Sequence, residues 1–187
     1  MQQLTSRRPG RATGEIGIWI FIFLDLTVFS LFFIATTYYR GRGPAAFDAG
    51  QAMLDARLAL VNTVVLVTGS LAAARAVQAV RLGNADVARK LLSGTALCGV
   101  IFAAIKIFEY HHLFGAGITI NTSVFFLCYI GFTMVHLAHV IIGTIVLVTL
   151  AHLLPDRATH GAVECGALYW HMVDLLWLIL FPLLYLT

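Results

Sequence analysis

The chain has 187 residues, of which 60% are hydrophobic and only 11% are charged. A soluble globular domain carries about 25% charged residues, so this composition excludes an ordinary water-soluble domain. The formal net charge is +3, but the basic residues stand at the ends of long apolar runs and form no patch with interleaved aromatic residues. We therefore expect a membrane protein and no nucleic-acid partner.

Five apolar segments are long enough to cross a bilayer, which takes about 20 mostly apolar residues. In chain order they span residues 16–39, 58–79, 91–114, 124–153 and 166–186. The first is too long for the apolar region of a signal peptide and precedes no small-residue cleavage site, so we expect it to be retained. Turn sequences lie at residues 40–44, 81–84 and 154–157. These features predict an all-α membrane bundle, with a cytoplasmic segment 1–15 and one transmembrane domain, 16–187.

The basic residues predict how the helices are oriented. With the N-terminus inside, eight of them face the cytoplasm: Arg7, Arg8, Arg11, Arg75, Arg81, Arg89, Lys90 and Arg157. Arg40, Arg42 and Arg57 then lie outside, and Lys106 lies within the third span. This excess of inner positive charge is typical of membrane proteins and predicts an N-in, C-out topology.

Aromatic residues near the predicted helix ends suggest contacts with the membrane interface. Tyr110 and Tyr185 stand near outer ends, as do Tyr38 and Tyr39. The pair Tyr169 and Trp170 stands near the inner end of the last span. We expect all of these rings at the interface.

The cysteines predict no disulfide framework and no zinc site. There are three, Cys98, Cys128 and Cys165, and no two are spaced as CxxC. Two lie inside apolar runs and the third at a helix start. We expect them to be small packing residues.

Asp25 lies nine residues into the first span, near mid-depth of the bilayer at 1.5 Å per residue. A charge there is costly, and no basic residue shares its helix face. We expect a neutral, protonated Asp25 that faces other helices. It is either a proton-linked or reactive carboxyl, or a hydrogen-bonded contact between helices, with Asn62 or Thr63 as the expected partner.

Lys106 and Glu109 are three residues apart on the third span, so they share a helix face and can neutralise one another. We expect a local ion pair near the outer end of this helix. The sequence then continues into the external interface, where polar side chains cost little.

Two polar pairs on the last two spans raise the question of a metal or haem site. His136 and His139 are three residues apart, as are His171 and Asp174. Three imidazoles and a carboxylate could bind a metal. However, His171 is about five residues from the inner end of its predicted helix and the other histidines fourteen or more from theirs, an offset of about 12 Å. We therefore expect no metal site and favour polar contacts between helices.

Small residues recur on two of the central helices. They are Gly94 and Gly99 on the third span, with Gly131, Ala138 and Gly143 on the fourth. Small residues allow helix backbones to approach closely in a membrane.

Long strings in the last two spans resemble subunit III of the haem–copper oxidase superfamily. They are Gly131-Phe132, residues 136–144 (HLAHVIIGT) and residues 164–177 (ECGALYWHMVDLLW), supported by residues 62–66 (NTVVL), Glu109-Tyr110 and residues 19–25 (WIFIFLD). The resemblance covers nearly the whole chain after residue 14. The chain looks like the five-helix form, and its short length, Asp25 in place of the commoner Glu, and residues 180–185 are most similar to the NorE-like branch associated with nitric oxide reductase.

The resemblance implies a non-catalytic accessory subunit in a bacterial inner membrane. Such subunits bind no haem or copper, pack on the catalytic subunit, hold phospholipids in a cleft and support proton uptake, turnover or assembly. Asp25 corresponds to the buried acid of the family. The remaining polar residues become contacts between helices or with cleft lipid: Asn62, Lys106, Glu109, His136, His139, Glu164, Trp170, His171 and Asp174.

Two other functions remain open from the residues alone. A small proton-linked transporter or channel could use Asp25, although no broken helix of the kind that frames a substrate site is apparent. A membrane metalloenzyme could use the histidines as ligands. The sequence leaves open whether a partner complex reduces oxygen or nitric oxide.

Overall fold

The computed structural model of the protein describes residues 16–154 and 160–186. The predicted cytoplasmic segment 1–15, and Arg157 in the turn predicted at 154–157, lie outside the described residues. The described part folds into six helices: α1 (Ile16–Arg42), α2 (Pro44–Gln51), α3 (Ala56–Arg81), α4 (Ala85–Gly115), α5 (Val124–Leu153) and α6 (His160–Tyr185). Five of them are long and apolar enough to span a membrane, which confirms the predicted all-α architecture.

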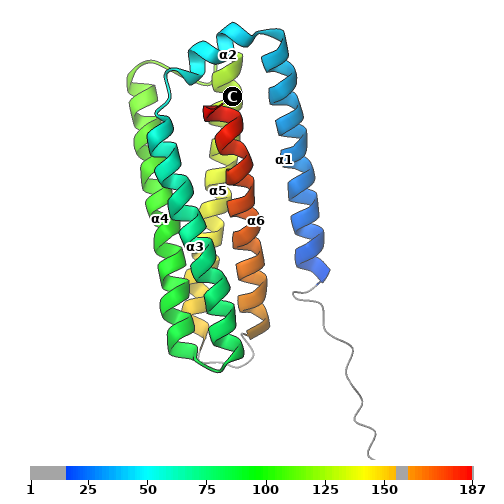
Figure 1. Ribbon diagram of the computed structural model, residues 1–187, viewed down its shortest axis with the longest axis vertical. Coiled ribbons are helices and arrows are strands. Elements are labelled where there is room, and N and C mark those ends of the chain that lie inside the picture. The colour runs from blue at the N-terminus through cyan, green and yellow to red at the C-terminus, as the bar shows by residue number, and fades with distance from the viewer. Residues whose placement is uncertain (1–15, 155–159, 187) are drawn as a thin grey trace, which may run out of the picture.

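The short helix α2 was not predicted from the sequence. Residues 40–44 were expected to form a turn, but Pro44 stands in the first turn of α2, where its missing N–H is not needed. Phe47 of α2 is buried and packs edge-on against Phe125 at the start of α5. This contact holds α2 across the end of the bundle, between α1 and α3 (Figure 1).

The last helix begins at His160, six residues before the predicted start at Gly166. Its first turns contain residues with little hydropathy signal, but they pack against the bundle. Val163 is fully buried, and Glu164 Oε1 accepts a hydrogen bond from Arg81 Nε at 2.9 Å. Tertiary contacts thus extend α6 beyond its apolar segment.

Helices α3, α4, α5 and α6 form an up-and-down bundle, and α1 lies to one side of it (Figure 1). Within the bundle α3 packs against α4 and α6, and α5 packs against α4 and α6. Helix α1 contacts α5 and α6. The first turn of α1 and the C-terminal end of α6 lie at opposite ends of the molecule, as an odd number of spans requires. The N-in, C-out orientation remains a prediction.

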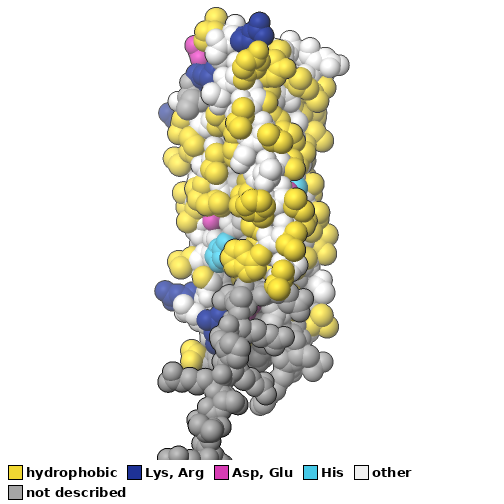
Figure 2. All heavy atoms as spheres, turned by 90° about the vertical axis from the view of Figure 1, so that its right-hand side faces the viewer, with side chains coloured by type: hydrophobic (Ala, Val, Ile, Leu, Met, Phe, Trp, Pro, Cys, Tyr) yellow, Lys and Arg dark blue, Asp and Glu magenta, His cyan; other side chains and the backbone are white. Residues whose placement is uncertain are grey.

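The surface matches a membrane setting. Apolar side chains cover the middle of the face in Figure 2, and lysine and arginine side chains gather toward its two ends. Helix α1 is the least buried of the five spans, with 11% of its apolar window buried, compared with 56% for α6. Helix α6 is therefore the central helix and α1 a peripheral one.

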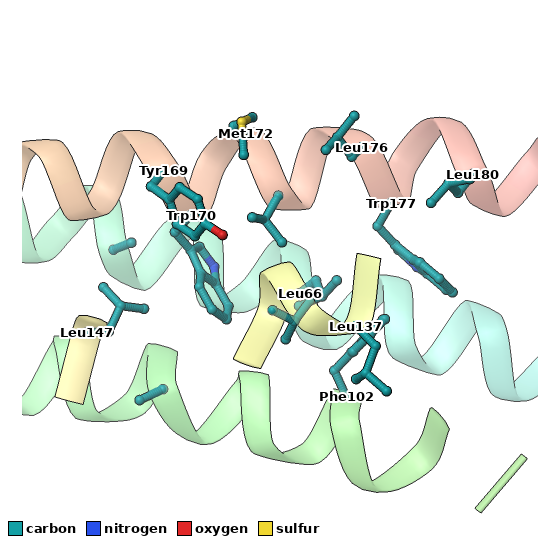
Figure 3. Close-up of a cluster of buried hydrophobic side chains, with 14 of the residues drawn as sticks. Leu66, Phe102, Leu137, Leu147, Tyr169, Trp170, Met172, Leu176, Trp177 and Leu180 are labelled. Atoms are coloured by element: carbon teal, nitrogen blue, oxygen red, sulfur yellow. The ribbon is translucent and has the colours of Figure 1, made fainter. Parts of the chain in front are cut away.

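The core of the bundle is built around Trp170, a fully buried residue of α6 (Figure 3). Two glycines leave room for its ring. A Cβ on Gly99 of α4 would overlap Thr144 and come within 2.8 Å of the Trp170 ring, and one on Gly143 of α5 would lie 3.1 Å from it. A Cβ on Gly69 of α3 would be 3.5 Å from Trp170 Nε1. Helices α4 and α5 thus approach one tryptophan through their glycines, and α3 lies in ordinary contact with it.

The small-residue prediction is confirmed at Gly99 and Gly143. It is wrong at Gly94 and Gly131, where an added Cβ would meet nothing within 4 Å, and at Ala138, which is exposed. Spacing along a helix shows where small residues recur, but not which of them face a neighbouring helix.

Candidate functional site

The most developed polar site is a buried cluster around Lys106 and Glu109 on α4. Lys106 Nζ donates to Glu109 Oε2 at 2.8 Å, which confirms the predicted ion pair. The same ammonium donates to the hydroxyl groups of Tyr129 on α5, at 2.9 Å, and Tyr185 on α6, at 3.0 Å. Both tyrosines donate to Glu109 Oε1, at 2.6 and 2.8 Å. The cluster therefore ties three helices together.

Aromatic rings complete the surroundings of the ammonium. Lys106 Nζ lies between 4.9 and 5.7 Å from four ring centroids, those of Tyr110, Tyr129, Trp177 and Tyr185. At these distances the negative face of an aromatic ring attracts a cation. Lys106 is fully buried and Glu109 almost so.

A second hydrogen-bonded layer extends the cluster along α5. Tyr110 Oη donates to Thr133 Oγ1 at 2.8 Å, and Thr133 Oγ1 donates to the carbonyl of Tyr129 at 2.6 Å. A buried ion pair is tolerated when its remaining lone pairs and protons are also satisfied. Here every charged atom has at least one partner, so the cluster is a rigid unit and not a loosely held pair.

This cluster corrects the prediction that Tyr110 and Tyr185 lie at the membrane interface. Each is only 8% exposed, because its hydroxyl group is used inside the bundle. Tyr38 and Tyr39, in contrast, are exposed at 57% and 48%, and their position at the membrane interface stays a prediction. Sequence position near a helix end does not reveal whether a ring turns toward lipid or toward a buried charge.

A second polar contact attaches α1 to α5. Asp25 Oδ1 lies 3.2 Å from His139 Nε2, and His139 Nδ1 is 2.7 Å from the carbonyl oxygen of Val135. Asp25 was expected to contact Asn62 or Thr63, and this is wrong, because α1 packs on α5 and α6 and Asp25 meets His139 of α5. Thr63 instead accepts a hydrogen bond from Trp177 Nε1 at 3.0 Å.

Aromatic packing surrounds the Asp25–His139 contact. Phe29 of α1 meets the His139 ring edge-on at 5.8 Å, and Phe32 stacks on Phe132 at 4.7 Å between centroids. Tyr169 of α6 donates to the carbonyl oxygen of His139 at 3.1 Å. Tyr169 and Trp170 were predicted at the interface, but they are 8% and 0% exposed. They belong to the packing between helices.

A third polar contact joins α3 to α6. Ser70 Oγ lies 2.6 Å from His171 Nδ1. Asp174, one turn further along α6, is 7% exposed, and its Oδ1 has no hydrogen-bond partner among the described residues. His171 and Asp174 therefore face α3.

His136 and Asn62 are both fully buried. Neither ring nitrogen of His136 nor either amide atom of Asn62 is hydrogen bonded within the part of the chain that the structure describes. The His136 ring stacks on Trp177 at 5.3 Å and meets Phe102 edge-on at 5.5 Å. In this environment His136 acts as a packing residue of the aromatic core.

The histidines that were weighed as metal ligands have different partners. His136 packs on Trp177, His139 meets Asp25, and His171 meets Ser70. Within residues 16–154 and 160–186, no three His, Cys, Asp or Glu side chains are grouped so that they could hold a metal ion.

The histidines of α5 and α6 lie closer in depth than the sequence predicted, because α6 begins earlier than expected. Because α6 begins at His160, His171 is eleven residues into its helix. His139 is fourteen residues from the end of α5 at Leu153, so the offset shrinks to about 5 Å at 1.5 Å per residue. What separates His139 from His171 is the direction of the side chains, toward α1 and toward α3.

Several residues of these contacts were missed in the sequence. Tyr129, Thr133 and Ser70 were not singled out, and Trp177 was noted only as part of a motif. A buried Lys106 needs more than one partner. This requirement was the only indication in the sequence that tyrosines would surround it. It does not indicate which of the many aromatic residues supply them.

The chain is similar to known proteins over almost its whole length. Residues 11–187 match the family described as cytochrome c oxidase subunit III. The chain is 31% identical to cytochrome c oxidase subunit 3 of Synechocystis, over 95% of this chain and 81% of that protein. It is 32% identical to cytochrome c oxidase subunit 3 of Corynebacterium diphtheriae, over 91% of this chain and 86% of that protein.

Relatives outside the cytochrome c oxidases are also similar. Subunit 3 of the cytochrome bo(3) ubiquinol oxidase of Pseudomonas aeruginosa is 27% identical over 91% of this chain and 83% of its own length. A heme-copper oxidase subunit I+III of Aeropyrum pernix is 29% identical over 91% of this chain, which spans 22% of that longer protein.

Proposed function

Because the chain belongs to the cytochrome c oxidase subunit III family, we propose that it works as a non-catalytic accessory subunit of a haem–copper respiratory complex. It is a multi-pass protein of the bacterial inner (cell) membrane. The observation that carries the proposal is the match to the family over residues 11–187, which includes all five spans.

The proposed partner is the catalytic subunit of the complex. The relative from Aeropyrum pernix, whose name gives subunits I and III together, supports this pairing. The polar contacts inside this chain also fit a supporting role. Lys106, Glu109 and their tyrosines are used to join helices, and such a cluster stabilises a scaffold.

We infer that haem and copper or iron belong to the partner and that this chain binds structural phospholipid and supports proton uptake, turnover or assembly. Exposed apolar residues along α1, including Phe23, Leu31 and Ile34, offer surface for lipid chains or a partner helix. The finer assignment to the NorE-like branch, and thus to a nitric oxide reductase, has its support in Asp25 and in residues 180–185.

Purification from the native membrane tests the accessory role. A tagged full-length chain in mild detergent should bring down a haem-containing catalytic subunit, whose identity decides between oxygen and nitric oxide as substrate. After dissociation, the chain alone should show no haem absorption and no stoichiometric iron, copper or zinc. Recovery without a catalytic subunit, or metal retained by the isolated chain and lost in His136→Leu, would overturn the proposal.

A proton-linked role of the chain by itself is the second candidate. Asp25 and His139 are both titratable and lie in contact in the middle of a span, and Asp25 Oδ2 has no hydrogen-bond partner among the described residues. Proton flux through liposomes that contain only this chain, abolished by Asp25→Asn, would favour this function. Equal flux in protein-free liposomes would exclude it.

A further inference from the structure

A groove of about 290 Å³ lies on the outer surface of the bundle between α4 and α5. Its floor is formed by two small buried residues, Ala96 and Ala151. Leu97, Val100 and Val148 form its apolar sides and are exposed. The groove is open to the space that lipid chains occupy around a membrane protein.

One end of the groove is polar. Arg89, Ser93 and His152 line it, and all three side chains are exposed. Arg89 is four residues after the start of α4, and His152 is one residue before the end of α5. These residues therefore lie at the end of the bundle where the positive-inside rule predicts the cytoplasm.

The length of the groove matches the depth of one lipid leaflet. Val100 lies eleven residues after Arg89 on α4, about 16 Å deeper at 1.5 Å per residue. A headgroup beside Arg89 would place an acyl chain along Leu97 and Val100, since this depth is close to the hydrocarbon half-thickness of about 15 Å. The polar end of the groove thus lies where a lipid headgroup would be, and its apolar side lies where the acyl chain would be.

The charge at the polar end favours an anion. Arg89 makes no salt bridge with any carboxylate among residues 16–154 and 160–186, including Asp86 three residues before it. Lys90 follows directly in sequence and is exposed. A guanidinium binds phosphate oxygens in a bidentate manner, and the Ser93 hydroxyl can donate one more hydrogen bond.

We infer that this groove binds a phospholipid of net negative charge, with its phosphate at Arg89 and an acyl chain between Leu97, Val100 and Val148. The inference rests on the lipid-binding part of the proposed function and gives it a location and a headgroup charge. Negatively charged lipids are attracted by basic residues at the cytoplasmic surface, which is the predicted side of this groove.

The test is lipid retention by the full-length chain in nanodiscs of phosphatidylglycerol and phosphatidylethanolamine, followed by native mass spectrometry. The wild type should retain phosphatidylglycerol in preference. Arg89→Gln should reduce this preference about fivefold, the effect of removing one basic residue near the surface. Arg75→Gln, which removes an exposed arginine of α3 outside the groove, should leave it unchanged.

A second variant tests the apolar part without changing charge. Val148 is 41% exposed, so Val148→Trp fills the groove without disturbing the core and should lower retention of both lipids. Equal retention of the two lipids by the wild type, or an unchanged preference in Arg89→Gln, would overturn the inference. Recovery of the catalytic subunit with Arg89→Gln would show that the accessory role stands whatever the groove binds.

Discussion

Asp25 Oδ1 lies 3.2 Å from His139 Nε2, so the one acidic residue of α1 meets a histidine of α5 that lies 114 residues later in the chain. Apart from this contact, α1 packs little against the other helices and is the least buried of the five spans. The contact therefore supplies a polar link where apolar packing is limited, and it gives the outer helix a defined position against α5.

Asp25→Asn should preserve insertion and assembly, because size and hydrogen bonding to His139 are nearly retained. The free energy of unfolding should fall by no more than about 1.7 kcal/mol, the upper range for hydrogen bonds between membrane helices. Unfolding in mixed micelles with dodecyl sulfate measures this change, and a cycle with His139→Gln isolates the pair. If Asp25→Asn abolishes insertion or complex formation, the expectation from the sequence that Asn can replace this side chain is wrong.

Lys106→Met should destabilise the protein strongly, by about 3–5 kcal/mol, because Glu109 then remains buried without its cation. The double variant Lys106→Met with Glu109→Gln should recover a large part of this loss. The exposed Lys90 provides the control, since Lys90→Met should change stability by less than about 0.5 kcal/mol. Equal effects at Lys106 and Lys90 would contradict the buried cluster.

Tyr185→Phe should lower the free energy of unfolding by about 1–3 kcal/mol, because it removes a hydroxyl that serves both Glu109 and Lys106. Tyr39→Phe is the matched control, since Tyr39 is 48% exposed and should have almost no effect. Thermal unfolding in detergent, followed by tryptophan fluorescence, compares the two. If Tyr185→Phe leaves the free energy of unfolding unchanged, the last turn of α6 is not held by this cluster.

Gly99→Ala should destabilise the bundle by about 1–3 kcal/mol, the cost of overpacking, because the new methyl group overlaps Thr144 and approaches the Trp170 ring. Gly94→Ala on the same helix meets nothing within 4 Å, so it should be neutral or stabilise by up to about 1 kcal/mol through helix propensity. Chemical denaturation of both variants gives the comparison. Similar losses in the two would exclude a tight approach at Gly99.

The orientation can be tested with reporters at the C-terminus. Because basic residues gather at the end predicted to be cytoplasmic, a C-terminal alkaline phosphatase should be active outside, and a green fluorescent protein there should stay dark. Fusions truncated after Arg81, at the end of α3, should show the reverse. A fluorescent C-terminal fusion would invert the topology.

The ion pair of Lys106 and Glu109 was predictable because both residues belong to one helix and are three positions apart. The tyrosines that complete it come from α5 and α6, 20 and 76 residues from Glu109. No periodicity links such distant positions. The same limit explains why Asp25 was matched with Asn62 or Thr63 when its partner is His139.

By itself, the sequence determined the positions of the five spans, the polar segments that connect them and the protein family. Length, hydropathy and motif strings are all properties of continuous segments. Only the tertiary structure decided how each helix is rotated about its axis. Lipid is as apolar as the interior of the bundle, so apolar patterning does not mark the inward face. Packing decides instead, through Trp170 among its glycines and through Asp25 against His139.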